Sequence, residues 1–117
     1  MSDFNIFHNP RCSKSRQTLA LLQENGIEPN IIEYIKEAPS KNQLKSIIKM
    51  LDVEPREIMR KNEAEYKAAG LNDESLSKEQ QIALMVEYPK VIERPIVFTK
   101  DKAAVGRPPE NVLVLLK

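Results

Sequence analysis

Hydrophobic and polar positions alternate in short blocks along this 117-residue chain, and the block pattern changes from strand-like to helix-like and back. The apolar run Phe4 to Phe7 is bounded by polar residues on both sides, which predicts a short buried strand. A helical pattern begins near Ser13 and ends at Asn25-Gly26, a common helix stop. The residues Ile31 to Ile35 predict a second strand. A strand, a helix and a strand in this order favour a right-handed parallel unit.

The middle of the chain, at about residues 40–90, is predicted to be a helical insertion. Ser40 with Gln43 and Ser77 with Gln80 have the spacing of capping boxes, in which each side chain covers a free backbone N–H. The helices that these and similar signals predict begin near residues 40, 55, 62 and 77. The first of them has one clear apolar face, made by Leu44, Ile47, Ile48 and Leu51.

The end of the chain predicts a hairpin and a last helix. Ile96 to Phe98 and Ala103 to Val105 are short strand-like runs joined by a polar turn, most simply as an antiparallel pair, and Pro108-Pro109 then opens a helix. The whole order predicts one α/β domain over residues 1–117, a small mixed four-stranded sheet with flanking helices. A ligand site is expected beyond the carboxyl ends of the parallel strands, where the loop from His8 lies.

Composition narrows the class of protein. The chain is 41% hydrophobic and 30% charged, and its 18 Lys and Arg nearly balance its 17 Asp and Glu, so nothing favours nucleic-acid binding and any role for positive charge must be local. No secretory signal precedes the first apolar run, which is too short to cross a membrane, and the single cysteine cannot form an internal disulfide. We therefore expect a cytoplasmic protein.

The loop from His8 to Arg16 holds the only cysteine and the only histidine. A lone cysteine is often an inert buried residue. Cys12, however, precedes a helix, where free backbone N–H groups and the helix dipole favour the thiolate, and Arg11, Lys14 and Arg16 add potential positive charge nearby. The context therefore predicts a nucleophile, with His8 as a group that lowers its pKa. One cysteine and one histidine do not predict a metal site.

Ser15 occupies the position at which a dithiol redox protein would carry its second cysteine. The segment therefore cannot close an internal disulfide, and the resolving thiol must come from another molecule. Two compatible roles are open for Ser15: it caps the helix, or it donates a hydrogen bond to the Cys12 thiolate, or it does both.

Arginines stand at both ends of the predicted hairpin. Arg94 precedes Pro95, an X-Pro bond of the kind that can be cis, and Arg107 follows Gly106. Together with Arg60 from the insertion, they could converge on an anion and bind it bidentately. For any one arginine taken alone, a solvated surface position is the default.

Several segments match one known family in order and spacing: His8-Asn9-Pro10, Cys12, Ser15-Arg16, Arg60-Lys61-Asn62-Glu63, Arg94-Pro95-Ile96-Val97 and Gly106-Arg107-Pro108. Over nearly its whole length the chain resembles the glutaredoxin-coupled arsenate reductase (ArsC) family. In the number of its residues it is similar to the members of the short bacterial branch of that family. The resemblance implies a thioredoxin-like fold, a single domain and an oxyanion substrate, arsenate.

The resemblance also implies roles for particular residues. Cys12 would attack arsenate, His8 would help to keep it as a thiolate, and Ser15 would hydrogen-bond it. The residues implied to hold the oxyanion and its reduced product are Arg60, Arg94 and Arg107. The residues implied to shape the site are Asn9, Pro10 and Pro95. Glutathione would be the co-substrate and glutaredoxin the protein partner, with no bound cofactor or metal and no nucleic-acid or membrane partner.

Two other functions fit parts of the sequence. A monothiol oxidoreductase would act on glutathione mixed disulfides, with arsenate incidental. A thiol-stress regulator that binds RNA polymerase would have a similar fold, but the proteins of that group carry a Cys-x-x-Cys switch in this loop, and Ser15 replaces its second cysteine.

Overall fold

The computed structural model describes residues 3–116 and divides the chain into two compact units. Among the described residues, the sheet unit comprises 3–37 and 94–116, and the helical unit comprises 38–93. No helix in the described part of the chain has the length and apolar character needed to span a membrane. The assignment of residues 1–117 to a single functional domain stays a prediction.

The sheet unit is built on four short strands, β1 (Asn5–Phe7), β2 (Asn30–Ile32), β3 (Ile96–Phe98) and β4 (Ala103–Val105), in the order β2-β1-β3-β4. β1 runs parallel to β2 and antiparallel to β3, and β3 pairs with β4 as an antiparallel hairpin. The predicted mixed sheet is therefore confirmed. Both its parallel pair and its hairpin lie where the hydrophobic pattern indicates.

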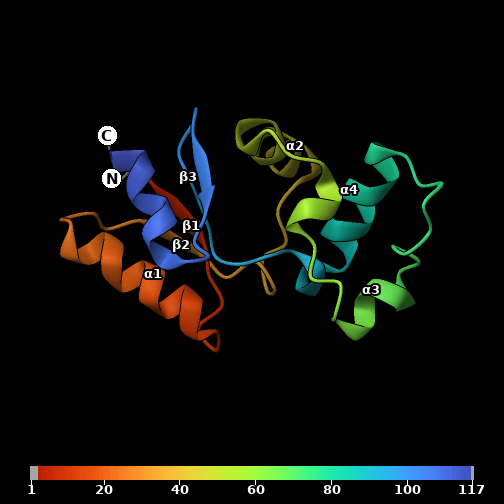
Figure 1. Ribbon diagram of the computed structural model, residues 1–117, viewed down its shortest axis with the longest axis horizontal. Coiled ribbons are helices and arrows are strands. Elements are labelled where there is room, and N and C mark those ends of the chain that lie inside the picture. Colours follow the sequence, from red (N-terminus) through yellow and green to blue (C-terminus); the bar gives the residue numbers. More distant parts are fainter. Residues whose placement is uncertain (1–2, 117) are drawn as a thin grey trace. The chain divides into compact units, whose positions relative to one another are not determined.

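Helices α1 (Ser13–Glu24) and η3 (Pro109–Leu116) pack against each other beside the sheet (Figure 1). Because side chains alternate along a strand, every second strand residue faces these helices. The result is one apolar core between sheet and helices. Its buried members are Ile6, Leu22, Val97, Ala104, Val112 and Leu115.

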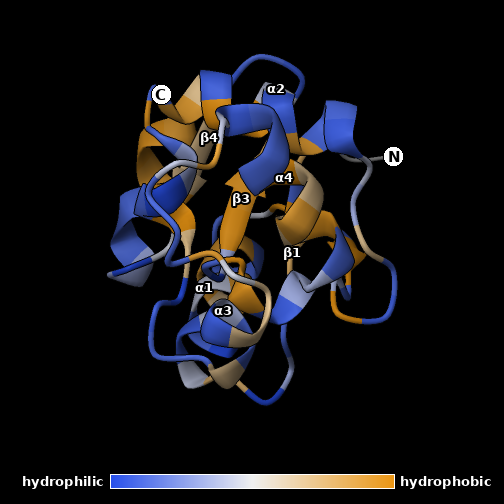
Figure 2. Ribbon diagram, turned by 90° about the vertical axis from the view of Figure 1, so that its right-hand side faces the viewer, coloured by the Kyte–Doolittle hydropathy of each residue, from blue (hydrophilic) through white to orange (hydrophobic). Residues whose placement is uncertain are grey.

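The aromatic side chains of Phe7 and Phe98 lie at the strand positions that alternate with the core residues Ile6 and Val97. The ring of Phe7 contacts that of Phe98 with centroids 5.1 Å apart and that of Tyr34 with centroids 5.9 Å apart. All three side chains are buried. Apolar residues on both faces give β1 and β3 the continuous hydrophobic character visible in Figure 2, which is typical of the central strands of a sheet.

Two elements, the strand β2 and the helix η3, differ from their predictions. β2 ends at Ile32 rather than Ile35, because the backbone N–H groups of Lys36 and Glu37 both bond the carbonyl of Glu33 at 2.9 Å and close a turn. Ile35 is consequently 38% exposed. The last helix is a 3₁₀ helix over its eight residues.

The helical unit follows the predicted order, and α2 packs on α4 within it. Its elements are α2 (Lys41–Leu51), η1 (Pro55–Ile58), α3 (Ala64–Ala68), α4 (Lys78–Glu87) and η2 (Pro89–Val91). The capping box at α4 is confirmed: Gln80 N–H donates to Ser77 Oγ at 3.1 Å and Ser77 N–H to Gln80 Oε1 at 2.8 Å. At α2 only one half forms, from Gln43 N–H to Ser40 Oγ at 3.0 Å.

Arg56 organises the longest loop of the helical unit. Its guanidinium donates to the hydroxyl of Tyr66 at 3.1 Å, to the carbonyl of Asp73 at 2.6 Å and to the carbonyl of Leu71. A half-buried cation that satisfies these oxygens fixes the loop after α3. Arg56 therefore has a structural role in this unit.

Candidate active site

Cys12 is the last extended residue before α1, with φ −93° and ψ 123°. Its own N–H donates to the carbonyl of Asn9 at 2.9 Å, which closes the short loop after β1. The thiol thus stands at the free N–H groups of the first helical turn, and that turn contains no acidic residue. The residue is only 9% exposed.

The pKa of the Cys12 thiol is lowered from its ordinary value. Burial, the largest influence, raises this pKa, but the groups that favour the thiolate outweigh it together. In decreasing order these are the backbone N–H of Ser15, the guanidinium of Arg94, the backbone N–H of Lys14 and the guanidinium of Arg107. Such a thiol is more nucleophilic at neutral pH than a free cysteine.

The guanidinium of Arg107 contacts the thiol directly. Its Nη2 lies 3.6 Å from Cys12 Sγ, while its Nε donates to the carbonyl of Arg94 at 2.8 Å. The hairpin register pairs Ile96 with Val105, so the residues just outside the two strands, Arg94 and Arg107, emerge at the same end. The hairpin therefore places two positive charges near the start of α1, although both arginines are distant from Cys12 in the sequence.

The structure differs from the expectation that cations of the loop itself surround the thiol. The side chains of Arg11 and Lys14 are exposed, and Arg16 donates from Nη1 to the carbonyl of Pro10 at 2.8 Å. The positive charges that lower the Cys12 pKa belong to the hairpin. Lys14 acts through its backbone N–H instead.

His8 and Ser15 form a buried pair behind the thiol. His8 Nδ1 lies 2.6 Å from Ser15 Oγ, which also accepts from the N–H of Asn9 at 3.0 Å. Burial lowers the pKa of His8, Glu33 opposes this and Arg16 adds to it. A neutral imidazole is therefore favoured, and it orients Ser15 rather than offering the thiolate a positive charge.

Ser15 does not cap α1. The N-cap residue is Cys12, without a side-chain cap, and Ser15 is fully buried in the first turn. Its hydroxyl is engaged by His8 and Asn9, and its backbone N–H is the group that favours the thiolate. The sequence pattern points to the residue but not to the atom that acts.

Arg60 belongs to the helical unit and is held there. Its Nη1 forms an ion pair with Glu63 Oε1 at 2.7 Å, in which the two side chains are 29% and 30% exposed. Its N–H donates to the carbonyl of Val91 at 2.6 Å, beside an antiparallel bridge between Met59 and Ile92. The guanidinium thus already has a carboxylate partner.

Comparisons with known proteins agree with one another. The sequence model of the ArsC family matches residues 7–115. The chain belongs to the ArsC family. It is 49% identical over 112 residues to the uncharacterized protein YfgD of Escherichia coli K12, an alignment covering 95% of this chain and 94% of YfgD. It is 46% identical over 112 residues to an arsenate reductase of Haemophilus influenzae, covering 95% and 97% of the two chains.

A solved structure supports the same assignment. The arsenate reductase from Vibrio cholerae has 48% sequence identity and a TM-score of 0.91, with 95% of each chain covered. The thioredoxin-like fold of this ArsC family member is therefore confirmed. Within its described residues, no group of three or more His, Cys, Asp or Glu side chains is arranged to hold a metal ion.

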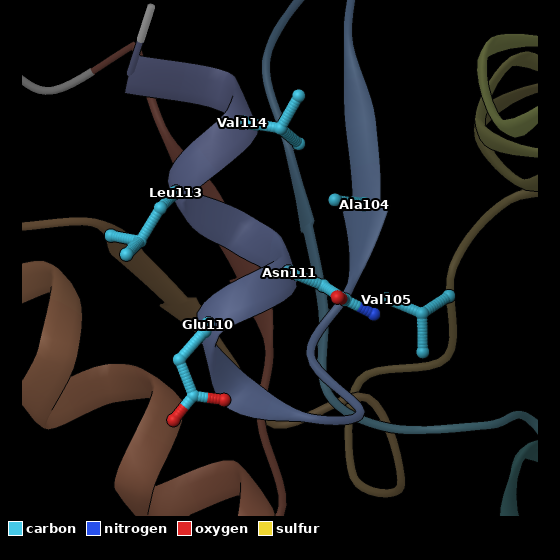
Figure 3. Close-up of a pocket in the computed structure, with 6 residues that line it drawn as sticks. All are labelled: Ala104, Val105, Glu110, Asn111, Leu113 and Val114. Carbon is cyan, nitrogen blue, oxygen red and sulfur yellow. The ribbon is translucent and has the colours of Figure 1, made fainter.

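The candidate site around Cys12 does not coincide with the pocket shown in Figure 3. That pocket lies between β4 and η3 in the sheet unit, and Cys12 and Arg107 are not among its lining residues. It is lined by Ala104, Val105, Glu110, Asn111, Leu113 and Val114. Cys12 lies at the start of α1, where 9% of the residue is exposed.

Proposed function

We propose that this protein reduces arsenate to arsenite, with the Cys12 thiolate as nucleophile and glutathione as reducing co-substrate. One observation carries the proposal: a guanidinium lies 3.6 Å from a thiol whose pKa is lowered. A thiolate alone would repel an oxyanion. A cation in contact with the thiolate offsets both negative charges, and this is what attack on arsenate requires.

The hairpin supplies two cations that favour the thiolate. Arg94 and Arg107 both favour the charged form of Cys12. Guanidinium groups bind tetrahedral oxyanions through paired N–H donors, so the arginines that favour the thiolate also suit the substrate. Arg107 approaches the thiol through Nη2 while its Nε is fixed on a carbonyl, so the guanidinium is held beside the atom that would attack the anion.

The chemistry follows in two steps. The Cys12 thiolate attacks pentavalent arsenic, a sulfur–arsenic bond forms, and an arsenic-bound oxygen leaves as water after protonation. The glutathione thiolate then attacks Cys12 sulfur. A disulfide between Cys12 and glutathione forms, the sulfur–arsenic bond breaks, and arsenic keeps its electron pair and leaves as trivalent arsenite.

The cycle closes with an external thiol, because Cys12 is the only cysteine of the chain. A glutaredoxin thiolate attacks the glutathione sulfur of the mixed disulfide and releases the Cys12 thiolate. This partner, the need for reduced glutathione and hence a cytoplasmic location are parts of the proposal. The same holds for Arg60 as a third anion-binding residue, a role that rests on the resemblance.

The test is a coupled assay with purified protein, glutathione, glutaredoxin, glutathione reductase and NADPH. We expect arsenate-dependent NADPH consumption that disappears in Cys12→Ser. Arg11→Ala, which removes an exposed arginine of the same loop, is the matched control and should retain activity. Consumption no greater than that of Cys12→Ser would exclude the proposal. A glutathione mixed disulfide offered in place of arsenate tests the alternative monothiol oxidoreductase.

A further inference from the structure

Gly106 lies at a very close approach between the hairpin and α1. It is buried at the end of β4, and its N–H donates to the carbonyl of Pro95 at 2.9 Å. A Cβ at this position would stand 2.6 Å from Thr18 Oγ1, 2.7 Å from Pro95 Cγ and 3.1 Å from Thr18 Cγ2. Any side chain here would push the hairpin away from the helix.

Thr18 cannot easily give way. It is fully buried on α1, and its hydroxyl donates to the carbonyl of Lys14 at 2.8 Å. Lys14 is one of the residues whose backbone N–H favours the Cys12 thiolate. Thr18 therefore touches the hairpin with the same side chain that braces the first turn of α1.

We propose that Gly106 and Thr18 are positioning residues that set the distance between Arg107 and the Cys12 sulfur. Arg107 follows Gly106 directly, and its contact with the thiol spans 3.6 Å. The guanidinium is carried by the hairpin and the thiol by the start of α1, so the closeness of the hairpin to the helix at Gly106 and Thr18 limits how near the two groups come. The consequence for arsenate turnover rests on the proposed function, but the consequence for the thiol does not.

Gly106→Ala is expected to raise the pKa of Cys12, because Arg107 retreats from the sulfur. Arsenate turnover, as kcat/KM, should fall about 10- to 100-fold, the usual result of displacing a catalytic group by a fraction of an ångström to an ångström. The thiol pKa is measured from the pH profile of Cys12 alkylation by iodoacetamide, an assay that needs no arsenate.

A double-mutant cycle with Thr18→Ala identifies the contact. Two of the three close atoms that a Cβ at position 106 meets belong to Thr18, so Gly106→Ala should raise the thiol pKa less in the Thr18→Ala background than in the native chain. Equal effects in both backgrounds, or an unchanged thiol pKa in Gly106→Ala, would overturn the inference.

Gly26→Ala is the matched control for lost stability. Gly26 lies in the same unit with φ +77° and has no atom within 4 Å of a Cβ, so alanine strains the backbone there without touching Arg107. It should lower the Tm and leave the thiol pKa unchanged; a shifted pKa would mean that general destabilisation moves the thiol, which overturns the inference.

Thr18→Ala alone keeps the inference testable if Gly106→Ala does not fold. Thinning the contact should let Arg107 approach the sulfur, lower the thiol pKa and speed Cys12 alkylation at neutral pH; an unchanged or slower alkylation would contradict the inference. The thiol pKa could follow the expected pattern although neither the native chain nor any variant reduces arsenate. In that case the positioning role stands and the proposed function fails.

Discussion

The two units hold their arginines in different ways. In the helical unit, Arg60 is paired with the carboxylate of Glu63 and Arg56 is bound by a hydroxyl and backbone carbonyls. In the sheet unit, Arg107 is anchored by Nε on a neutral carbonyl and presents Nη2 to a thiol. The Glu63 carboxylate offsets the charge of Arg60, whereas the charge of Arg107 lies beside the Cys12 sulfur and favours its thiolate.

The strongest test of this contrast is Arg107→Ala. We expect arsenate kcat/KM to fall about 100-fold, comparable with the loss of one donor to a developing oxyanion, and the Cys12 pKa to rise because a cation that lowers it is gone. Arg107→Lys keeps the charge but loses the Nε anchor, so it should recover only part of both effects. Steady-state kinetics and thiol alkylation measure them.

Arg56→Ala tests the other side of the comparison. The side chain serves a hydroxyl and carbonyls of its own unit, so its removal should lower the free energy of unfolding by about 2 kcal/mol. Urea denaturation measures this loss. The alkylation profile of Cys12 should not change under conditions where the variant is folded. A raised thiol pKa would show that the arginines of the two units do not have separate roles.

His8 gives a pH dependence with a definite sign. Its pKa is lowered below the ordinary 6.5, chiefly by burial, so as pH falls through 6.5 the unfolded chain takes up a proton before the folded one. The folded state should therefore lose stability below that pH, by at most about 1.4 kcal/mol per pH unit. Denaturation at several pH values in Cys12→Ser, which removes the thiol titration, measures the slope.

Cys12→Ser with His8→Gln is the control for that slope, because glutamine does not titrate. The acid-side loss of stability should flatten in this double variant. An equally steep slope would assign the titration to another group and leave the buried neutral imidazole without support.

Glu63→Gln has the smallest expected effect. It keeps an oxygen acceptor for Arg60 but removes the charge of an ion pair that is partly exposed. If Arg60 binds the substrate, the KM for arsenate should fall about threefold, in line with the modest strength of such pairs. Competition by phosphate should strengthen to the same extent. An unchanged KM would restrict Arg60 to the structural role that Arg56 has in this unit.

Much of the fold could be predicted from the sequence because its signals are periodic. The short apolar runs around Phe7 and Val97 place the central strands, and the Ser77 and Gln80 pair marks the start of α4. The extent of β2 could not be predicted. Ile35 is as apolar as Ile31, and only the turn closed on the Glu33 carbonyl decides that the strand stops earlier.

The candidate site, like the fold, could be predicted from the sequence only in part. A thiol at a helix start and arginines at the two ends of a hairpin can be inferred from order along the chain. The directions of side chains in a short loop cannot. Lys14 and Ser15 act on the thiol through backbone N–H groups, and the Ser15 hydroxyl bonds His8 instead. Composition alone carries no signal for such choices between atoms of one residue.

The register of the hairpin constrains which insertions and deletions evolution can accept. Thr99 N–H bonds the carbonyl of Lys102 at 2.7 Å across the turn, so added residues there lengthen a surface loop. A single deletion between Val105 and Arg107 would turn the guanidinium to the opposite side of the sheet, because side chains alternate. Homologues should therefore vary in length at the tip of this hairpin and not at its base.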